Sequence, residues 1–361
     1  MAAQVTNYKC PACTGPLHFS GESQRLECDY CGENYEIAAM DALYAGKEGA
    51  SRAETAPPAG GHWSQEEAAH LRAYICPSCS AELVCDDTTA ATSCPYCGNP
   101  TVLPGRFSGM LRPDFVIPFR LDKAAALAAL KAHYKGKRFL PKAFLQENHL
   151  EEIKGIYVPF WLFDVDSQVE MQWLGKIRHS HSDGNEEVTT TEHYHIIRQG
   201  SIAFQMVPVD GASNMPDAHM DAIEPFDYGD LRDFSTSYLP GFLANKYDMD
   251  QRTCSQRAHQ RIRASAEGAV TATVGGYSSL EIKHSRISLE EGPVKYALFP
   301  VWMLSTRWKE KSFLFAMNGQ TGKLIGDLPV DKGRFWKWFV GISLPLMALL
   351  GGVLFLGGGI L

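Results

Sequence analysis

Eight of the ten cysteines in this 361-residue chain fall into four Cys-x-x-Cys pairs. The pairs are Cys10 with Cys13, Cys28 with Cys31, Cys76 with Cys79, and Cys94 with Cys97. Each such turn delivers two thiolates from one tight loop, and two turns complete the tetrahedral four-sulfur set that Zn²⁺ takes in structural sites. In both halves 14 residues separate the first pair from the second, enough for a short β-hairpin. The spacing therefore predicts two zinc ribbons, each holding one structural Zn²⁺.

The two cysteine sets are copies of one another. Each cysteine of the second set follows its counterpart in the first by 66 residues. Three other matched positions have the same offset, namely Pro11 and Pro77, Leu17 and Leu83, and Gly32 and Gly98. The glycine after the second pair suits a turn that needs a positive φ. The pattern indicates an internal duplication.

Two other chemistries use the same spacing. A rubredoxin-like site would hold iron with four cysteines, and a single Cys-x-x-Cys can act as a redox pair. Zinc is the favoured interpretation because a reducing compartment is expected and no thioredoxin-like βαβ pattern surrounds either pair. Four thiolates leave no open coordination position, so the sites are expected to be structural. The two remaining cysteines, Cys85 and Cys254, are expected to be small buried apolar residues.

The last 23 residues, Phe339 to Leu361, carry no charge. As a helix they would extend about 34 Å, enough for the hydrocarbon core of a bilayer. Aromatic and basic residues come just before, namely Trp336 and Trp338 with Lys332, Arg334 and Lys337. Basic flanks favour the cytoplasmic side. The sequence predicts a single-pass, tail-anchored protein of the bacterial inner (cytoplasmic) membrane, with no N-terminal signal peptide and the bulk of the chain in the cytoplasm.

Between the ribbons and the anchor, one pattern occurs twice. A helix predicted after Asp122 and another after Asp250 are each followed by an aromatic-rich strand with a Pro-x-Trp motif. We interpret this as a duplicated α+β domain. The predicted organisation is zinc ribbon one at 1–43, a flexible linker at 44–63, a short helix with zinc ribbon two at 64–105, the duplicated α+β domain at 106–330, and a basic flank with the transmembrane helix at 331–361. The fold class is α+β multidomain.

Four histidines lie on a predicted hairpin. Strands are expected at 164–181 and 188–209 around a turn at 182–185, and the histidines are His179, His181, His193 and His195. Each pair alternates along its strand and so shares a face. If residue 181 lay opposite residue 193, all four would cluster and could bind a metal. A polar strand face without a ligand is the alternative.

The charge pattern divides the chain. The net charge of −7 gives no overall reason to expect nucleic-acid binding, and residues 1–43 hold six acidic residues against two basic ones. Residues 106–142 hold nine Lys and Arg, and the helix after Asp250 is also basic. These basic faces are either solvated or lie against anionic lipid. This division predicts a middle domain on the membrane and ribbons projecting away on their linker to meet proteins.

Several longer motifs point to a family. Besides the ribbons, they are YVPFW, LFPVW, VPVDGASNMPDAHMDAIEPFD, YLPGFLANKYD and FAMNGQTGKLIGDLPVDKGR. With them the chain resembles bacterial membrane-anchored double zinc-ribbon proteins associated with phage-shock-protein-A and flotillin/stomatin-like partners, often mislabelled as primosomal helicase-like. The resemblance implies a membrane scaffold in envelope stress or membrane homeostasis. It carries no catalytic residues over to this chain, and some relatives have more than one membrane span.

The function expected from these patterns is that of a zinc-ribbon adaptor recruiting protein partners to the membrane. No nucleophile triad, paired carboxylates or nucleotide-binding loop argues for an enzyme. Two other functions stay open at this stage. One is a membrane-associated nucleic-acid-binding factor that uses the basic helices, and the other is an enzyme with a metal at the four histidines.

Overall fold

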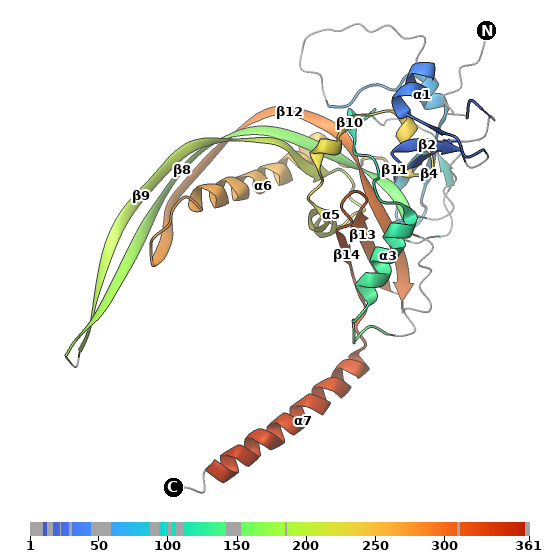
Figure 1. Ribbon diagram of the computed structural model, residues 1–361. Helices are drawn as coiled ribbons and strands as arrows, with labels where there is room; N and C mark the ends of the chain where they lie inside the picture. The colour runs from blue at the N-terminus through green and yellow to red at the C-terminus, as the bar shows by residue number, and fades with distance from the viewer. Residues whose placement is uncertain are drawn as a thin grey trace.

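Two long strands organise the molecule. The computed structural model describes residues 10–12, 17–21, 23–28, 31–44, 59–86, 94–97, 99, 103–105, 111–141, 153–184, 186–308 and 311–357. Within it, β8 (Lys154–Asp183) and β12 (Ser279–Trp308) pair antiparallel along almost their whole length. One end of this pair is buried in a body of helices and short strands, and the other end leaves the body as a curved arm (Figure 1). The chain is an α+β protein.

The body contains the same series of elements twice. A short strand, a helix and a long strand follow one another as β7 (Phe115–Val116), α3 (Lys123–Tyr134) and β8, and again as β11 (Leu243–Asn245), α6 (Gln251–Thr271) and β12. Each short strand pairs in parallel with the long strand of the other unit, β7 with β12 and β11 with β8. As predicted, both helices begin after an aspartate, whose carboxylate accepts a backbone N–H of the first turn.

The two Pro-x-Trp motifs connect these units. The indole N–H of Trp161 donates to the carbonyl of Met249, and that of Trp302 donates to the carbonyl of Leu121, both at 2.9 Å. Each carbonyl stands directly before the capping aspartate of the other unit's helix. Val158 and Phe299, each three residues before its tryptophan, pair with one another. The two motifs thus make reciprocal contacts, each with the start of the other unit's helix, on either side of the paired residues Val158 and Phe299.

Strand β9 (Glu186–Asp210) pairs with β8 and makes the arm three-stranded. The predicted hairpin is therefore confirmed. Helix α6 lies along the concave side of the arm (Figure 1). Alternate residues of β8, Val169, Met171 and Trp173, are buried in one apolar cluster with Ala266 of the helix. This period of two is what a strand with one covered face requires. Beyond the end of α6 the arm is largely exposed.

The second ribbon is part of the main sheet. It comprises α2 (Gln65–Ala69), β4 (Leu71–Ile75), β5 (Glu82–Asp86) and β6 (Leu103–Gly105). The predicted capping box of α2 is present, with Ser64 and Glu67 each accepting the other's backbone N–H. Strand β5 pairs with β11, which gives the order β10-β7-β12-β8-β11-β5-β4-β6 in an eleven-stranded sheet. The predicted boundary at residue 105 therefore does not separate the ribbon from the α+β body.

The first ribbon has a sheet of its own and is docked on the body. Its strands are β1 (Leu17–Ser20), β2 (Arg25–Cys28) and β3 (Asn34–Tyr35), followed by α1 (Ile37–Tyr44). The Phe19 ring packs against Tyr238 with centroids 5.5 Å apart, and the Gln24 side chain donates to the carbonyl of Phe119 at 2.6 Å. The expectation that this ribbon ranges freely on its linker is wrong, because Phe19 is buried against the body. Residues 45–58 of that linker lie outside the described residues.

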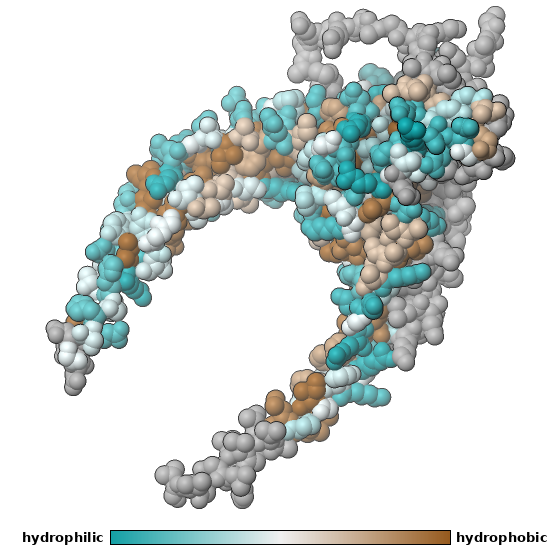
Figure 2. All heavy atoms as spheres, viewed as in Figure 1, coloured by the Kyte–Doolittle hydropathy of each residue, from teal (hydrophilic) through white to brown (hydrophobic). Residues whose placement is uncertain are grey.

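The remaining described elements complete the body and its C-terminal extension. They are α5 (Asp217–Ile223), β10 (Arg232–Asp233), β13 (Lys311–Asn318), β14 (Leu324–Gly326), α7 (Lys332–Gly357) and the 3-10 turns Tyr228–Asp230 and Thr236–Tyr238. Helix α7 projects away from the body (Figure 1). Figure 2 shows apolar residues along its described part.

The predicted membrane span coincides with most of α7. Within the part of the chain that the structure describes, no helix combines the length and the apolar character that crossing a membrane requires. Of the span predicted at 339–361, residues 358–361 and the side chains after Met347 lie outside that part. The transmembrane helix therefore stays a prediction.

Candidate metal centres

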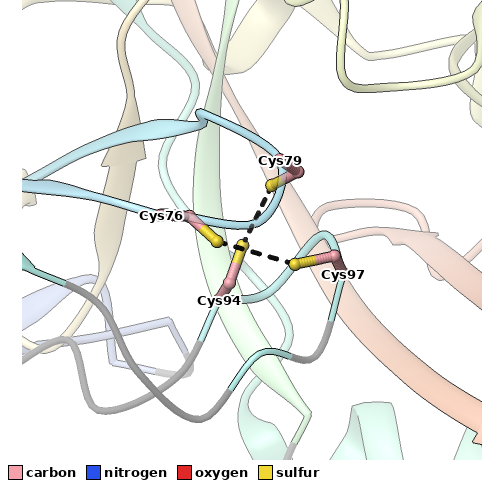
Figure 3. A group of neighbouring side chains, drawn as sticks. All are labelled: Cys76, Cys79, Cys94 and Cys97. Carbon is pink, nitrogen blue, oxygen red and sulfur yellow. Dashed lines mark hydrogen bonds between the residues drawn. The ribbon is translucent and has the colours of Figure 1, made fainter.

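The second ribbon brings four sulfur atoms together (Figure 3). Cys76 follows β4, Cys79 precedes β5, and Cys94 and Cys97 lie on one later turn. The Sγ atoms of Cys76 and Cys97 are 3.6 Å apart, as are those of Cys79 and Cys94. A tetrahedron with Zn–S bonds of about 2.3 Å has edges of about 3.8 Å, whereas a disulfide requires about 2 Å. The separations fit four thiolates around one metal ion.

The electrostatics of this cluster favour a cation if all four sulfurs are to be thiolates. Burial raises the pKa of the Cys79 thiol to about 11 and that of Cys94 further still. Burial also opposes ionisation of Cys76, but backbone N–H groups of Cys79 and Ser78 donate to its sulfur and lower its pKa on balance. Four sulfurs this close do not all ionise without a positive charge among them, which Zn²⁺ supplies.

The first ribbon has a matching arrangement. The Sγ atoms of Cys10 and Cys31 are 3.5 Å apart, and Cys28 completes a group within 4.8 Å, while Cys13 lies outside the described residues. Gly32, directly after the second pair, has φ of +74°, as predicted. Its N–H donates to the carbonyl of Cys28 at 2.9 Å and so closes the turn. Gly98, its counterpart in the second ribbon, is not described.

A tyrosine that sequence reasoning did not single out touches this first cluster. The hydroxyl of Tyr35 lies 3.4 Å from the Sγ of Cys10, and this hydrogen bond raises the pKa of Tyr35 to about 12. The second ribbon carries no aromatic residue at the matching position, Thr101. The offset of 66 residues that identified the duplication could not reveal this contact.

The two clusters are structural zinc sites. The described donors are cysteine sulfurs at separations that fit a tetrahedral site, four in the second ribbon and three in the first, and a set of four thiolates leaves no coordination position for a substrate. This confirms the zinc prediction and places seven of its eight cysteines. Zinc here would hold each turn in shape and contribute to folding.

The four histidines of the arm do not form a metal site. His193 lies opposite Lys176 and His179 lies opposite Thr190, so the register that would pair residues 181 and 193 does not occur. Side chains alternate between the two faces of a strand. His179 and His181 of β8 therefore lie on the face that α6 covers closer to the body, whereas His193 and His195 of β9 lie on the opposite face. Among the described residues, only the two cysteine groups could hold a metal ion.

The two cysteines outside the Cys-x-x-Cys motifs are buried, as expected. Cys85 and Cys254 are 0% and 3% exposed. Cys254 lies at the start of α6, where its thiol donates to the carbonyl of Asp210 at 3.5 Å. Burial raises the pKa of this thiol to about 12, so it is not a reactive nucleophile.

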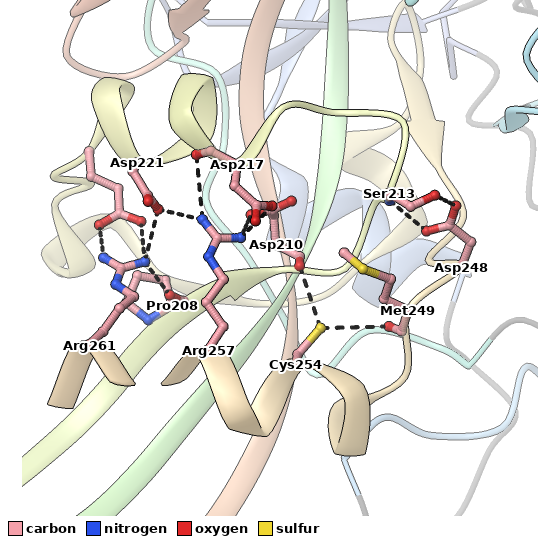
Figure 4. Close-up of polar contacts among 11 residues, drawn as sticks. Pro208, Asp210, Ser213, Asp217, Asp221, Asp248, Met249, Cys254, Arg257 and Arg261 are labelled. Carbon is pink, nitrogen blue, oxygen red and sulfur yellow. Dashed lines mark hydrogen bonds and ion pairs between the residues drawn. The ribbon is translucent and has the colours of Figure 1, made fainter. Parts of the chain in front are cut away.

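The basic helix after Asp250 has an internal role that the sequence did not reveal (Figure 4). The guanidinium of Arg257 contacts the carboxylates of Asp210, Asp217 and Asp221 at 2.6 to 2.8 Å. That of Arg261 contacts Glu224 at 2.5 Å. Burial raises the pKa of Asp210 to about 6, although Arg257 opposes this shift. These two arginines therefore join α6 to α5, so they are not part of the solvated or lipid-facing basic face expected of this helix.

Comparison with known proteins places the chain in a family. No family model matches it, and no solved structure matches it. A protein of Bacillus subtilis (strain 168), "Uncharacterized protein YdjG", is 33% identical over 361 aligned positions, which cover 98% of this chain and 99% of the relative. Identity at this level along both chains shows common descent.

Proposed function

The chain belongs to the family of the Bacillus subtilis protein YdjG, and we propose that it is a non-catalytic scaffold that recruits protein partners to the bacterial cytoplasmic membrane. Three features support this proposal. The metal centres are closed, the last helix is exposed and apolar, and a long arm extends from the body. The resemblance to proteins associated with phage-shock-protein-A and flotillin/stomatin-like partners adds a class of partner and a role in envelope stress or membrane homeostasis.

The single observation that carries membrane attachment is the exposure of α7. Trp336, Ile342 and Leu344 are 58%, 56% and 61% exposed, and the 3.6-residue turn of an α-helix places them on different sides of α7. A helix that is apolar all round needs an apolar environment, which for a helix outside the body is a bilayer. The proposed span continues through residues 348–361. Lys332, Arg334 and Lys337 at its start favour a cytoplasmic body.

The proposed surface for partners is the arm. Both ribbons are built into or docked on the body, so they are less suited to searching for partners than their sequence suggested. Within the described part of the chain, β9 pairs with β8 on one edge and has no strand on the other. An unpaired edge of this length offers backbone donors and acceptors to an added strand. Ile197, near the middle of β9, is 48% exposed.

Membrane attachment is tested by washing bacterial membranes that contain the full chain with alkaline carbonate. The wild-type chain should stay in the pellet. A Leu344→Arg, Met347→Arg double variant should move largely to the supernatant, because each arginine at the centre of a span costs about 2.5 to 3.5 kcal/mol. The matched variant Leu344→Ile, Met347→Leu should stay in the pellet. Release of the wild-type chain, or retention of the arginine variant, would contradict the proposed anchor.

Partner binding is tested with a photo-crosslinking amino acid at residue 197, and at residue 232 on the body as the control. Crosslinks from residue 197 to phage-shock or flotillin/stomatin-like proteins in native membranes are expected, with few from residue 232. Equal yields of these proteins from both positions, or none from residue 197, would argue against the arm as the recruiting surface.

A further inference from the structure

The start of α7 packs against the loop that follows α3. The N–H of Asp331 donates to the carbonyl of Phe139 at 2.8 Å, and the guanidinium of Arg334 donates to the carbonyl of Leu140 at 3.1 Å. The rings of Phe139 and Phe335 meet with centroids 5.7 Å apart. Two segments far apart in the sequence therefore form one surface where the apolar helix leaves the body.

This surface carries six basic side chains, which we call the basic collar. They are Lys135, Lys137, Arg138, Lys332, Arg334 and Lys337. All except Arg334 are exposed. The acidic residue of the two segments is Asp331, and its carboxylate accepts the backbone N–H of Arg334 at 3.0 Å. Among the described residues, none of the five exposed cations of the collar forms an ion pair, in contrast to Arg112 and Arg120 earlier in the same basic stretch.

Aromatic rings accompany these charges. The guanidinium of Arg138 lies over the ring of Trp338, 5.3 Å from its centroid. Trp336 and Trp338 are exposed, and Phe335 contacts both Trp336 and Phe139 of the loop after α3. Exposed tryptophans beside the cations of the basic collar, at the start of an apolar helix, have the composition of a membrane–water interface. Arginine held by an aromatic face also keeps its planar donors available to phosphate oxygens.

We propose that the basic collar binds the phosphate groups of anionic phospholipids in the leaflet that α7 enters. This inference rests on the proposed membrane attachment. Charge complementarity identifies the occupant, since five exposed cations that form no ion pair with a described residue meet a negatively charged leaflet. Lys135, Lys137 and Arg138 come from the body and not from the anchor. Lipid bound there would join the body to the membrane surface and fix the angle between the body and α7.

The test uses the full chain in liposomes and reads quenching of tryptophan fluorescence by brominated lipid. Brominated phosphatidylglycerol is compared with brominated phosphatidylcholine at equal mole fraction. The wild-type chain should prefer phosphatidylglycerol strongly at low salt. A Lys135→Gln, Lys137→Gln, Arg138→Gln variant should lose most of this preference, on the order of 100-fold in relative affinity if each charge contributes about fivefold. The preference should fall as salt rises.

The matched control is Lys123→Gln, Lys131→Gln, Arg252→Gln, which removes three exposed cations from outside the collar. It should keep the wild-type preference. Equal quenching by the two lipids in the wild-type chain, or loss of preference in both variants, would overturn the proposal.

Failure of the anchor is distinguished from failure of the collar by a second measurement. Neither variant changes α7, so both should resist carbonate extraction as the wild-type chain does. If the wild-type chain is extracted, the proposed membrane attachment fails. The collar is then tested alone by titrating the detergent-solubilised chain with short-chain phosphatidylglycerol, short-chain phosphatidylcholine and inorganic phosphate. Selective binding of phosphatidylglycerol, lost in the collar variant, would still support the collar, and binding of phosphate alone would overturn it.

Discussion

The second zinc ribbon and the first share one cysteine pattern, yet the body holds them in different ways. In the second ribbon, β4 and β5 flank the first Cys-x-x-Cys turn and pair with one another. Strand β5 also pairs with β11, which in turn pairs with β8. Among the described residues, the strands of the first ribbon pair only with one another, and the contact with the body is made by side chains such as Phe19 and Gln24 and by the backbone N–H of Phe19, which donates to the carbonyl of Pro240 at 3.3 Å. One copy of a duplicated module can therefore be part of the main sheet, while the other copy keeps a separate sheet and docks on the body.

This difference determines how far the structural effect of losing one metal ion extends into the body. Zinc in the second ribbon holds the turn between two strands of the main sheet, so its loss disturbs backbone pairing that continues to the centre of the body. Zinc in the first ribbon holds a small sheet whose contact with the body depends on a few side chains and on the backbone hydrogen bond from Phe19 to Pro240.

The largest effect is expected from removing one ligand in each ribbon. Cys94→Ser and Cys28→Ser should each lower the zinc content of the full chain from about two to about one. Cys94→Ser should also lower the free energy of unfolding of the body by more than about 4 kcal/mol, since zinc provides much of the folding energy of such a site. Elemental analysis and hydrogen exchange at β8 and β11 measure the two effects.

In Cys28→Ser the faster exchange should be confined to β1, β2 and β3. Partial chelation should show the same difference between the ribbons. Hydrogen exchange in β11 should rise only when zinc is lost from the second ribbon. The comparison between the ribbons fails if Cys28→Ser exposes β8 as much as Cys94→Ser does.

An effect of about 2 to 5 kcal/mol is expected from leucines at matched positions of the two copies. Leu17 is 3% exposed in β1 and Leu83 is 0% exposed in β5, where it lies opposite Asn245 of β11. Truncating either to alanine leaves a cavity in a buried cluster. Leu83→Ala should destabilise β11 and β8, whereas Leu17→Ala should act within the first ribbon, both with zinc retained. Equal protection of β11 in the two variants would count against this.

The sequence was informative where chemistry is local. A Cys-x-x-Cys turn fixes its geometry within four residues, so the metal sites could be predicted from spacing alone. The capping residues Ser64, Asp122 and Asp250 also act within one helical turn, and each begins a helix as predicted. The hairpin at residues 182–185 followed from alternation and a turn signal in the same way.

The sequence was uninformative where the outcome depends on partners far along the chain. Nothing near Leu83 indicates that its strand pairs with residues 243–245, and nothing near Arg257 shows that Asp210 and Asp217 will neutralise it. The register of His193 likewise depends on where the whole hairpin begins, because a shift by one residue moves every side chain to the other face.

A smaller effect, about 1 to 2 kcal/mol, is expected at the contact that docks the first ribbon. The Gln24 side chain donates to the carbonyls of Phe119 and Gly21 at 2.6 and 2.8 Å, and Gln24→Ala leaves the first of these acceptors without this donor. Faster exchange across β1 and β2 with unchanged zinc is the expected result. Ser23→Ala, whose hydroxyl bonds within the ribbon to Glu27, is the control and should leave docking unchanged.

The smallest effect is expected from ion pairs. One pair joins the second ribbon to the body, and the other lies inside the first ribbon. Lys246 of the body contacts Glu82 of the second ribbon at 2.8 Å, whereas Arg25 and Glu36 form a pair at 2.9 Å inside the first ribbon. Because Lys246 is the less exposed cation, Lys246→Met should cost about 0.5 to 1 kcal/mol and Arg25→Met about 0.5 kcal/mol or less. Double-mutant cycles with Glu82→Gln and Glu36→Gln, followed by urea unfolding of the full chain in detergent, isolate each pairing energy. Salt should weaken both. A larger coupling for Arg25 than for Lys246 would contradict the expected order of the two ion pairs.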